Sequence, residues 1–315
     1  MSEFSPALSE GMREFVDTAA TFRSASDDWA ARRAAFARQC AHFTPLPARP
    51  LVVEDRTIGG VTTRVYQPAH EAPECGWPVL VYFHGGGWTM GDHSTHDWFA
   101  HALLARADLA IVAVDYRLAP EFSYPAPLDD GLAVWNAIAA SAWPFDSGRA
   151  AVSGDSAGGT IAAALCMALR ARGQAQPRAQ ALLYPVLSAD TAFASMREHA
   201  LAPMLSAQGL ADSIALYLPD ERTRHTEEAM PLASKDFGGL APALLIVATE
   251  DVLRDQAVDY AARVREAGGT AEVLLAEGCV HGALRATYLP EAVACYERIA
   301  EFLIAYDAAG RTVQN

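Results

Sequence analysis

The stretch VSGDSAGGTIAA, residues 152–163, decides the fold, because small residues surround a single serine between an apolar run and a helix-like run. Within it, GDSAG (154–158) fits the pattern G-x-S-x-G. A strand that turns straight into a helix strains its turn residue, and bulky side chains two positions before or after would clash. The glycines therefore predict a tight turn that projects Ser156 beside the free N–H groups of a helix N-terminus. A serine that merely caps a helix is the alternative interpretation.

Short runs rich in valine, isoleucine and leucine predict strands on both sides of this turn. From residue 78 onward they alternate with helical stretches, and runs such as VLVYF and IVAV are apolar throughout, as in parallel strands covered on both faces. The fold class is therefore α/β, a mostly parallel eight-stranded sheet flanked by helices, with an antiparallel start. Strands are predicted at 51–58, 61–67, 78–84, 109–115, 149–154, 179–185, 242–250 and 271–277, and helices at 96–107, 128–141, 158–172, 254–267 and 290–306.

Two segments interrupt this alternation. Residues 1–45 carry helical patterning with an aromatic side chain about every seven positions, and residues 187–227 follow the predicted strand LLYP. Ligands of open α/β sheets bind at the carboxyl edge of the strands. We expect the two segments to meet above that edge as a helical cap, although packing on the sheet is the simpler alternative. The predicted organisation is a first cap part at 1–48, core at 49–186, a second cap part at 187–227 and core at 228–315.

The acidic composition limits the classes of partner. A formal net charge of −14 and a pI near 5.0 disfavour binding to nucleic acid or to anionic membrane surfaces. We see no apolar stretch of about 18 residues and no signal-peptide pattern, so we expect neither a membrane span nor secretion. The five scattered cysteines include no CxxC, which predicts reduced thiols in a cytoplasmic protein.

A second glycine-rich stretch, YFHGGGWTMG at 82–91, follows a predicted buried strand. Glycines let the backbone approach a ligand closely, and a serine nucleophile needs N–H donors for the negative oxygen that develops on its substrate. We expect an oxyanion hole formed by the N–H groups of Gly85, Gly86, Gly87 and Ala157. A flexible turn is the alternative.

These stretches and four others occur in an order that resembles bacterial members of the hormone-sensitive lipase group of α/β-hydrolases. The resemblance covers about residues 50–305 and implies an α/β-hydrolase fold, a helical cap and hydrolysis of short-chain esters. It also favours Gly86 and Gly87 over Gly85 as donors, and it implies a homodimer through the last strand and helix. The motifs are HGGGW (84–88), DYRLAPE (115–121), YPAPLDD (124–130), GDSAGG (154–159), EDVLRD (250–255) and VHGA (280–283).

The order serine, acid, histidine in α/β-hydrolases selects the remaining catalytic candidates. His281 follows the last predicted strand, whereas His199 and His225 fall in the expected cap, which we take to be too distant. Asp251 stands at the exit of the preceding strand, where the resemblance also places the acid. Asp255 lies further on and is interpreted as a charge at a helix N-terminus.

Two positions depart from the family pattern. Ala283 stands where phenylalanine is common and Val252 where proline is common, and Ala283 is expected to widen or loosen the pocket near the base. Trp88 and Tyr184 are candidates for lining the substrate pocket, although either suits the core equally well.

Two charged stretches have other interpretations. The stretch GDHSTHDWFAH (91–101) places His93, His96, Asp97 and His101 close together, so a zinc site is conceivable there but a structural role is expected. Asp115, Arg117 and Glu121 predict a buried network of charges under the glycine loop.

The sequence thus predicts a serine carboxylesterase that hydrolyses short-to-medium acyl esters through an acyl-enzyme, with no cofactor and no metal. Two alternatives remain. One is a non-catalytic small-ligand receptor on the same fold, similar to the plant gibberellin receptor, which lacks the histidine. The other is a hydrolase of lactone, amide or O-acetyl-sugar substrates.

Overall fold

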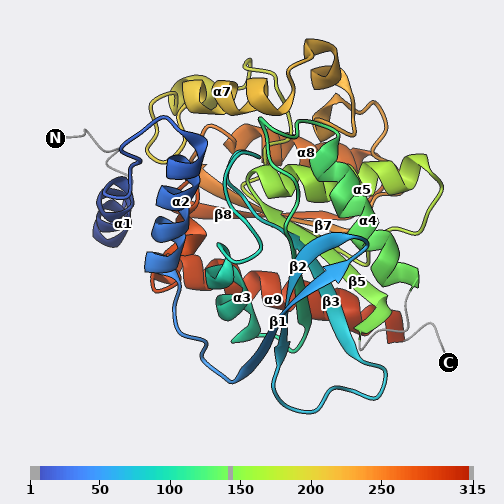
Figure 1. Ribbon diagram of the computed structural model, residues 1–315. Coiled ribbons are helices and arrows are strands. Elements are labelled where there is room, and N and C mark those ends of the chain that lie inside the picture. The colour runs from blue at the N-terminus through green and yellow to red at the C-terminus, as the bar shows by residue number, and fades with distance from the viewer. Residues whose placement is uncertain (1–7, 141–144, 312–315) are drawn as a thin grey trace.

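The computed structural model describes residues 8–140 and 145–311, which form a single eight-stranded sheet covered by helices on both faces (Figure 1). The sheet has the order β1-β2-β4-β3-β5-β6-β7-β8. Strands β1 and β2 form a hairpin, β2 pairs antiparallel with β4, and all other pairs are parallel. The strands are β1 (Leu51–Ile58), β2 (Val61–Pro68), β3 (Trp77–Phe83), β4 (Ala110–Val114), β5 (Phe145–Asp155), β6 (Gln180–Leu183), β7 (Ala243–Glu250) and β8 (Ala271–Val280).

Two hydrophobic clusters lie on opposite faces of this sheet. Along β3, Val79 and Val81 belong to one cluster, whereas Leu80 and Tyr82 belong to the other, because successive side chains of a strand point to opposite faces. The first face is covered by α4 (Ala126–Ala140), α5 (Ala157–Ala171) and α8 (Arg254–Glu266), and the second by α3 (Asp97–Leu104) and α9 (Pro290–Arg311) (Figure 1).

Helix α5 is the most enclosed of these helices. Every residue from Ala157 to Leu169 is buried, and many of them are alanines. Small side chains let this helix pack closely against the sheet and its neighbours, so α5 holds the turn at its N-terminus firmly in place.

Two further groups of helices correspond to the segments that interrupt the strand–helix alternation. They are α1 (Glu10–Ala20) and α2 (Trp29–Phe43) near the N-terminus, and α6 (Ala194–Glu198), α7 (Ala207–Tyr217) and the 3₁₀ turn η1 (Glu221–His225) later in the chain. In α1 the buried residues Met12, Phe15, Val16 and Ala19 recur at helical spacing and join the second cluster. Side-chain oxygens of Ser9 and Asp28 cap the starts of α1 and α2.

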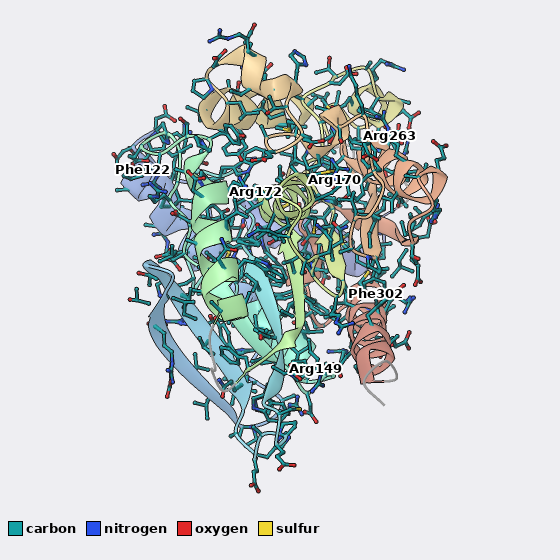
Figure 2. All side chains as sticks on the ribbon, turned by 90° about the vertical axis from the view of Figure 1, so that its right-hand side faces the viewer. Phe122, Arg149, Arg170, Arg172, Arg263 and Phe302 are labelled. Atoms are coloured by element: carbon teal, nitrogen blue, oxygen red, sulfur yellow. The ribbon has the colours of Figure 1, made fainter. Side chains whose placement is uncertain are left out.

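Arginines of the core helices hold the chain that follows α7 (Figure 2). Arg170 at the end of α5 pairs with Glu227 at 2.8 Å, and Arg172 pairs with Glu228 at 3.4 Å. Arg263 of α8 donates to the carbonyl of Leu232. Among the described helices, none has both the length and the apolar character needed to cross a membrane.

Candidate active site

Ser156 lies between the end of β5 and the start of α5, with φ 54° and ψ −118°. This conformation is unusual for a residue with a side chain, and such strain occurs where a nucleophile is presented on a sharp turn. A Cβ atom on Gly154 would lie 2.3 Å from the carbonyl of Gly158, and one on Gly158 would lie 2.0 Å from the carbonyl oxygen of Phe83. The glycines are therefore required because the turn packs on itself and on the end of β3.

His281 joins Ser156 to Asp251 at the carboxyl edge of the sheet. Its Nε2 lies 2.8 Å from Ser156 Oγ, and its Nδ1 lies 2.7 Å from Asp251 Oδ2. Asp251 follows β7 and His281 follows β8, so neighbouring parallel strands bring them together. The second carboxylate oxygen of Asp251 accepts the N–H of Leu253 at 3.0 Å. This chain of hydrogen bonds can remove a proton from the serine hydroxyl and stabilise the resulting imidazolium.

Beside the serine, Gly86 and Gly87 adopt φ values of +123° and +61°. A Cβ atom would lie 2.3 Å from Met90 O at Gly86 and 2.9 Å from Ser213 Oγ at Gly87. In the described part of the chain, the N–H groups of Gly86, Gly87 and Ala157 have no hydrogen-bond acceptor. They remain available to a ligand oxygen.

Gly85 differs from the other three expected donors. Its N–H donates to Asp155 Oδ1 at 2.7 Å, so this group is not free for a substrate oxygen. A Cβ atom on Gly85 would also lie 2.4 Å from Asp155 Oδ2. Its inclusion among the donors was therefore wrong, and Gly85 instead fastens the loop to the serine turn.

Aromatic side chains support this loop from below. Tyr116 donates its hydroxyl to His84 O at 2.6 Å, and the rings of the two residues stack with centroids 4.2 Å apart. Burial, together with the neighbouring His96, lowers the pKa of His84 to about 4, so the His84 imidazole is neutral at pH 7.

The expected network of buried charges under the loop is absent from the described residues. Asp115 lies 3.2 Å from His93, Arg117 pairs with Asp130 and Glu121 pairs with Arg33, each in a separate contact. The Arg117 side chain is 45% exposed, so this motif does not bury its charges. The uncharged Tyr116 provides the support. No group of three histidine, cysteine or acidic residues suited to a metal occurs in the described chain.

A cavity of about 1340 Å³ opens above Ser156 and His281. Its walls include residues of α1 and α2 on one side and residues 198–213 on the other. Trp88 lines the cavity and stacks on Tyr217 with ring centroids 4.3 Å apart. Tyr184 does not line it, because this ring lies in the core and packs edge-on against His281 at 5.0 Å.

Sequence reasoning missed most of the polar residues in the cavity wall, His199 and Arg285 among them. His199 lines the cavity, contrary to the expectation that it lies too far away, and its ring faces Glu250 at 3.9 Å and Arg254 at 3.1 Å. Arg285, in the 3₁₀ turn η3 (Ala283–Arg285), also lines it. The sequence signal for a place near the site was that Arg285 follows the candidate base His281 by four residues.

The sheet order and the strand-to-helix turn at Ser156 define an α/β-hydrolase fold, and the candidate site places a histidine between this serine and an aspartate. Residues 80–285 match the family described as alpha/beta hydrolase fold. The chain is 37% identical to the esterase LipI of Mycobacterium tuberculosis, over 75% of this chain and 78% of that protein. It is 39% identical to the carboxylesterase NlhH of the same organism, over 74% and 75%.

Solved structures agree with these relatives. A thermostable esterase from Pseudomonas putida superposes with a TM-score of 0.90 at 27% identity, covering 96% of this chain and 99% of that one. An esterase from Pyrobaculum calidifontis gives a TM-score of 0.87 at 30% identity, over 95% and 98%. The chain belongs to the alpha/beta hydrolase fold family, in its hormone-sensitive lipase group, and is a carboxylic ester hydrolase.

Proposed function

We propose that the protein is a serine carboxylesterase that uses Ser156, His281 and Asp251 as its catalytic triad. The observation that carries the proposal is the position of His281 Nε2, 2.8 Å from the serine oxygen, while its other nitrogen contacts a buried carboxylate. Ser156 Oγ attacks the ester carbonyl carbon as His281 accepts its proton. Asp251 holds the imidazole in the required tautomer. The N–H groups of Gly86, Gly87 and Ala157 stabilise the oxyanion.

The tetrahedral intermediate then breaks its bond to the alcohol oxygen, and His281 gives its proton to that oxygen. The acyl group remains bonded to Ser156 Oγ. Water attacks the acyl carbon while His281 again accepts a proton, and the acid leaves when the Oγ–carbon bond breaks and Ser156 recovers the proton. The reaction needs no cofactor and no metal, because the donors and the base lie within the chain.

The substrates in this proposal are esters with short-to-medium acyl chains. Relatives support this range, since the chain is 34% identical to an ethyl acetate hydrolase of Pseudomonas putida, over 70% of this chain and 71% of that protein. Residues 1–48, of which 1–7 lie outside the described residues, and residues 187–227 act as a cap, which is supported by the cavity walls to which residues of both segments contribute. The buried side chains of Trp88 and Leu210 limit the space beside the nucleophile.

A receptor without activity is less well supported, because this chain retains a histidine in contact with both the serine and the aspartate.

Intact-mass measurement tests the proposal. Wild-type protein treated with a phosphonate ester should gain one adduct on Ser156 and lose hydrolysis of p-nitrophenyl butyrate. Ser156→Ala should gain no adduct and lose about 10⁶-fold in kcat. An Ser156→Ala protein that keeps more than about a hundredth of the wild-type rate would refute the nucleophile, since triad losses are far larger.

A further inference from the structure

Arg285 is a buried cation in the wall of the active-site cavity. It lies four residues after His281, and only 7% of the residue is exposed to solvent. Nη1 donates to Gln39 Oε1 at 3.0 Å, and the guanidinium lies 5.0 Å from the ring centroid of Phe36, so α2 fixes its orientation. Within the described part of the chain, Nε has no hydrogen-bond partner.

The groups around Arg285 leave its charge without an ion pair. No carboxylate of the described residues lies within 4.0 Å of the guanidinium. Burial raises the pKa of the nearby Cys40 thiol to about 11, so this group is neutral at pH 7. Burial also raises the pKa values of the Tyr82 and Tyr184 hydroxyls well above their usual range. These neighbours therefore cannot balance the guanidinium charge.

Asp155 is the buried carboxylate that acts on Arg285 from a greater distance. Its Oδ1 accepts hydrogen bonds from Tyr82 and Gly85 and lies 3.4 Å from His96. Its Oδ2 has no hydrogen-bond partner among the described residues, so neither oxygen bonds the guanidinium directly. Burying a cation is unfavourable unless an anion or several acceptors contact it directly. The long-range attraction of Asp155 leaves the N–H groups of Arg285 able to bind a ligand.

Arg285 lies close to the backbone of Gly282, next to the candidate base, and borders the same cavity. Its Nη1 and Nη2 would lie 3.6 and 3.9 Å from a Cβ atom on Gly282, the residue that follows His281. Ser156, His281 and Arg285 all line the same cavity. An ester bound at Ser156 can therefore present a second group to the guanidinium. The planar fork of an arginine matches a carboxylate through two parallel hydrogen bonds.

We propose that Arg285 binds a carboxylate on the substrate, so that the preferred esters carry a negative charge in addition to the ester group. This inference rests on the proposed function and names the substrate class of the same site. Other cationic side chains in the cavity wall differ from Arg285, because Arg23 is exposed and Arg32 pairs with Asp27 at 2.5 Å. The protein carries a net charge of −14, and a local cation offsets the repulsion that an anionic ester would meet.

The experiment compares kcat/KM for two pairs of esters of matched shape, with acid release followed by titration at constant pH. In the acyl pair, methyl hydrogen glutarate is compared with methyl 5-methylhexanoate. In the alcohol pair, acetoxyacetate is compared with isobutyl acetate. The pairs distinguish a carboxylate on the acyl part from one on the alcohol part, because in each pair an isopropyl group replaces the carboxylate.

We expect the wild-type protein to prefer the charged ester in one pair by at least about tenfold. Arg285→Gln should lower that charged-to-neutral ratio by about tenfold to a hundredfold, as expected for hydrogen bonds to a charged group. Arg285→Lys keeps the charge but not the fork, and should give an intermediate ratio. Arg38→Gln removes the same charge from an exposed position of α2 outside the cavity wall and should leave the ratio within about twofold, as surface charges act weakly.

A wild-type protein that favours the neutral ester in both pairs overturns the inference. An equal loss on charged and neutral esters in Arg285→Gln also overturns it and assigns Arg285 the role of counter-ion to Asp155. If Arg285→Gln does not fold, the wild-type ratios and the Arg285→Lys ratios decide the question. If the wild-type protein hydrolyses none of the four esters and does not hydrolyse p-nitrophenyl butyrate, the result contradicts the proposed function instead.

Discussion

Asp155 Oδ1 accepts the backbone N–H of Gly85 at 2.7 Å, and this buried hydrogen bond joins the serine turn to the glycine loop. The same oxygen accepts the hydroxyl of Tyr82 at 2.6 Å. Residues 70 positions apart in the chain are thereby held in fixed register. The distance from the nucleophile to the donors of Gly86 and Gly87 depends on this contact.

Asp155→Ala should therefore lower kcat by about 10²-fold or more, the usual loss when one oxyanion donor is misplaced. Asp155→Asn should lose less, because its amide oxygen can still accept the N–H of Gly85. Initial rates on p-nitrophenyl butyrate measure the effect, and thermal unfolding checks that each variant is folded. Equal rates for Asp155→Ala and the wild type would show that the loop positions itself.

A substitution at Gly87 tests the role of the oxyanion N–H donors. Gly87→Ala would introduce a Cβ atom 2.9 Å from Ser213 Oγ and 3.3 Å from Ser213 Cβ at a φ of +61°, so the loop or the Ser213 side chain must shift, and we expect kcat to fall by at least about 10²-fold. Gly60→Ala is the matched control, because Gly60 has φ +82° and nothing within 4 Å. Both variants share a backbone cost of roughly 1–2 kcal/mol. If the two variants lose activity equally, backbone strain explains the loss.

The assignment of the acid is tested by a pair of isosteric variants. Asp251→Asn should lower kcat by about 10⁴-fold, because the amide favours the wrong histidine tautomer. Asp255→Asn should keep most activity, since the carboxylate of Asp255, at the start of α8, hydrogen-bonds within the described residues only to Arg254 and to the N–H of Ser195 in α6. Steady-state rates of both purified variants measure the difference. Similar mild losses at the two positions would mean that another residue orients His281.

The sequence predicted the strands and the turn because both depend on local pattern. Buried parallel strands are continuous apolar runs, and all eight predicted strands overlap β1 to β8. The sequence singled out Ser156, Asp251 and His281 as candidates because each follows a strand whose end lies at one edge of the sheet. Once the strand order is known, residues at the carboxyl ends of neighbouring parallel strands can be predicted to lie close together.

The contacts of individual groups could not be predicted in this way. The N–H of Gly85 is occupied by a side chain 70 positions away, and no local pattern separates it from the N–H of Gly86. Tyr184 faces the core and Trp88 the cavity, although both follow apolar strands. Arg285 resembles any surface arginine in the sequence, because its burial depends on α2. These properties arise only from tertiary packing.

The buried imidazole of His84 predicts acid sensitivity. Burial lowers its pKa from 6.5 to about 4 in the folded state, so the unfolded chain binds a proton at higher pH than the folded chain. The free energy of unfolding should fall as the pH drops from about 6.5 to about 4, by on the order of 3 kcal/mol from this residue. Above pH 6.5 the contribution is complete.

Urea unfolding at several pH values between 4.5 and 7.5 measures this effect. His84→Gln should be less stable than the wild type at pH 7.5, because it loses the ring stack on Tyr116, and the difference should shrink on acidification. His42→Gln changes an exposed histidine and should leave the slope of the wild type unaltered. Parallel curves for His84→Gln and the wild type would exclude His84 as a source of acid sensitivity.

The cavity wall predicts how activity depends on acyl length. Leu210 of α7 is 3% exposed and lines the cavity, as Trp88 and Leu205 do. Each buried methylene of the acyl chain gains up to about 0.8 kcal/mol, so kcat/KM should rise from acetate to about butyrate or hexanoate and fall when the chain meets this wall. Leu210→Ala should move the maximum to a longer chain by about two carbons, because it removes part of the wall.

Leu216→Ala is the matched control for this change, since Leu216 lies on the same helix but not in the cavity wall. It should leave the position of the maximum unchanged. The measurement is kcat/KM on p-nitrophenyl esters of two to sixteen carbons for the wild type and both variants. A wild-type maximum at twelve carbons or more would show a deep groove in place of a wall. A shift in Leu216→Ala equal to that in Leu210→Ala would show that α7 moves as a unit, and that no single side chain limits the acyl chain.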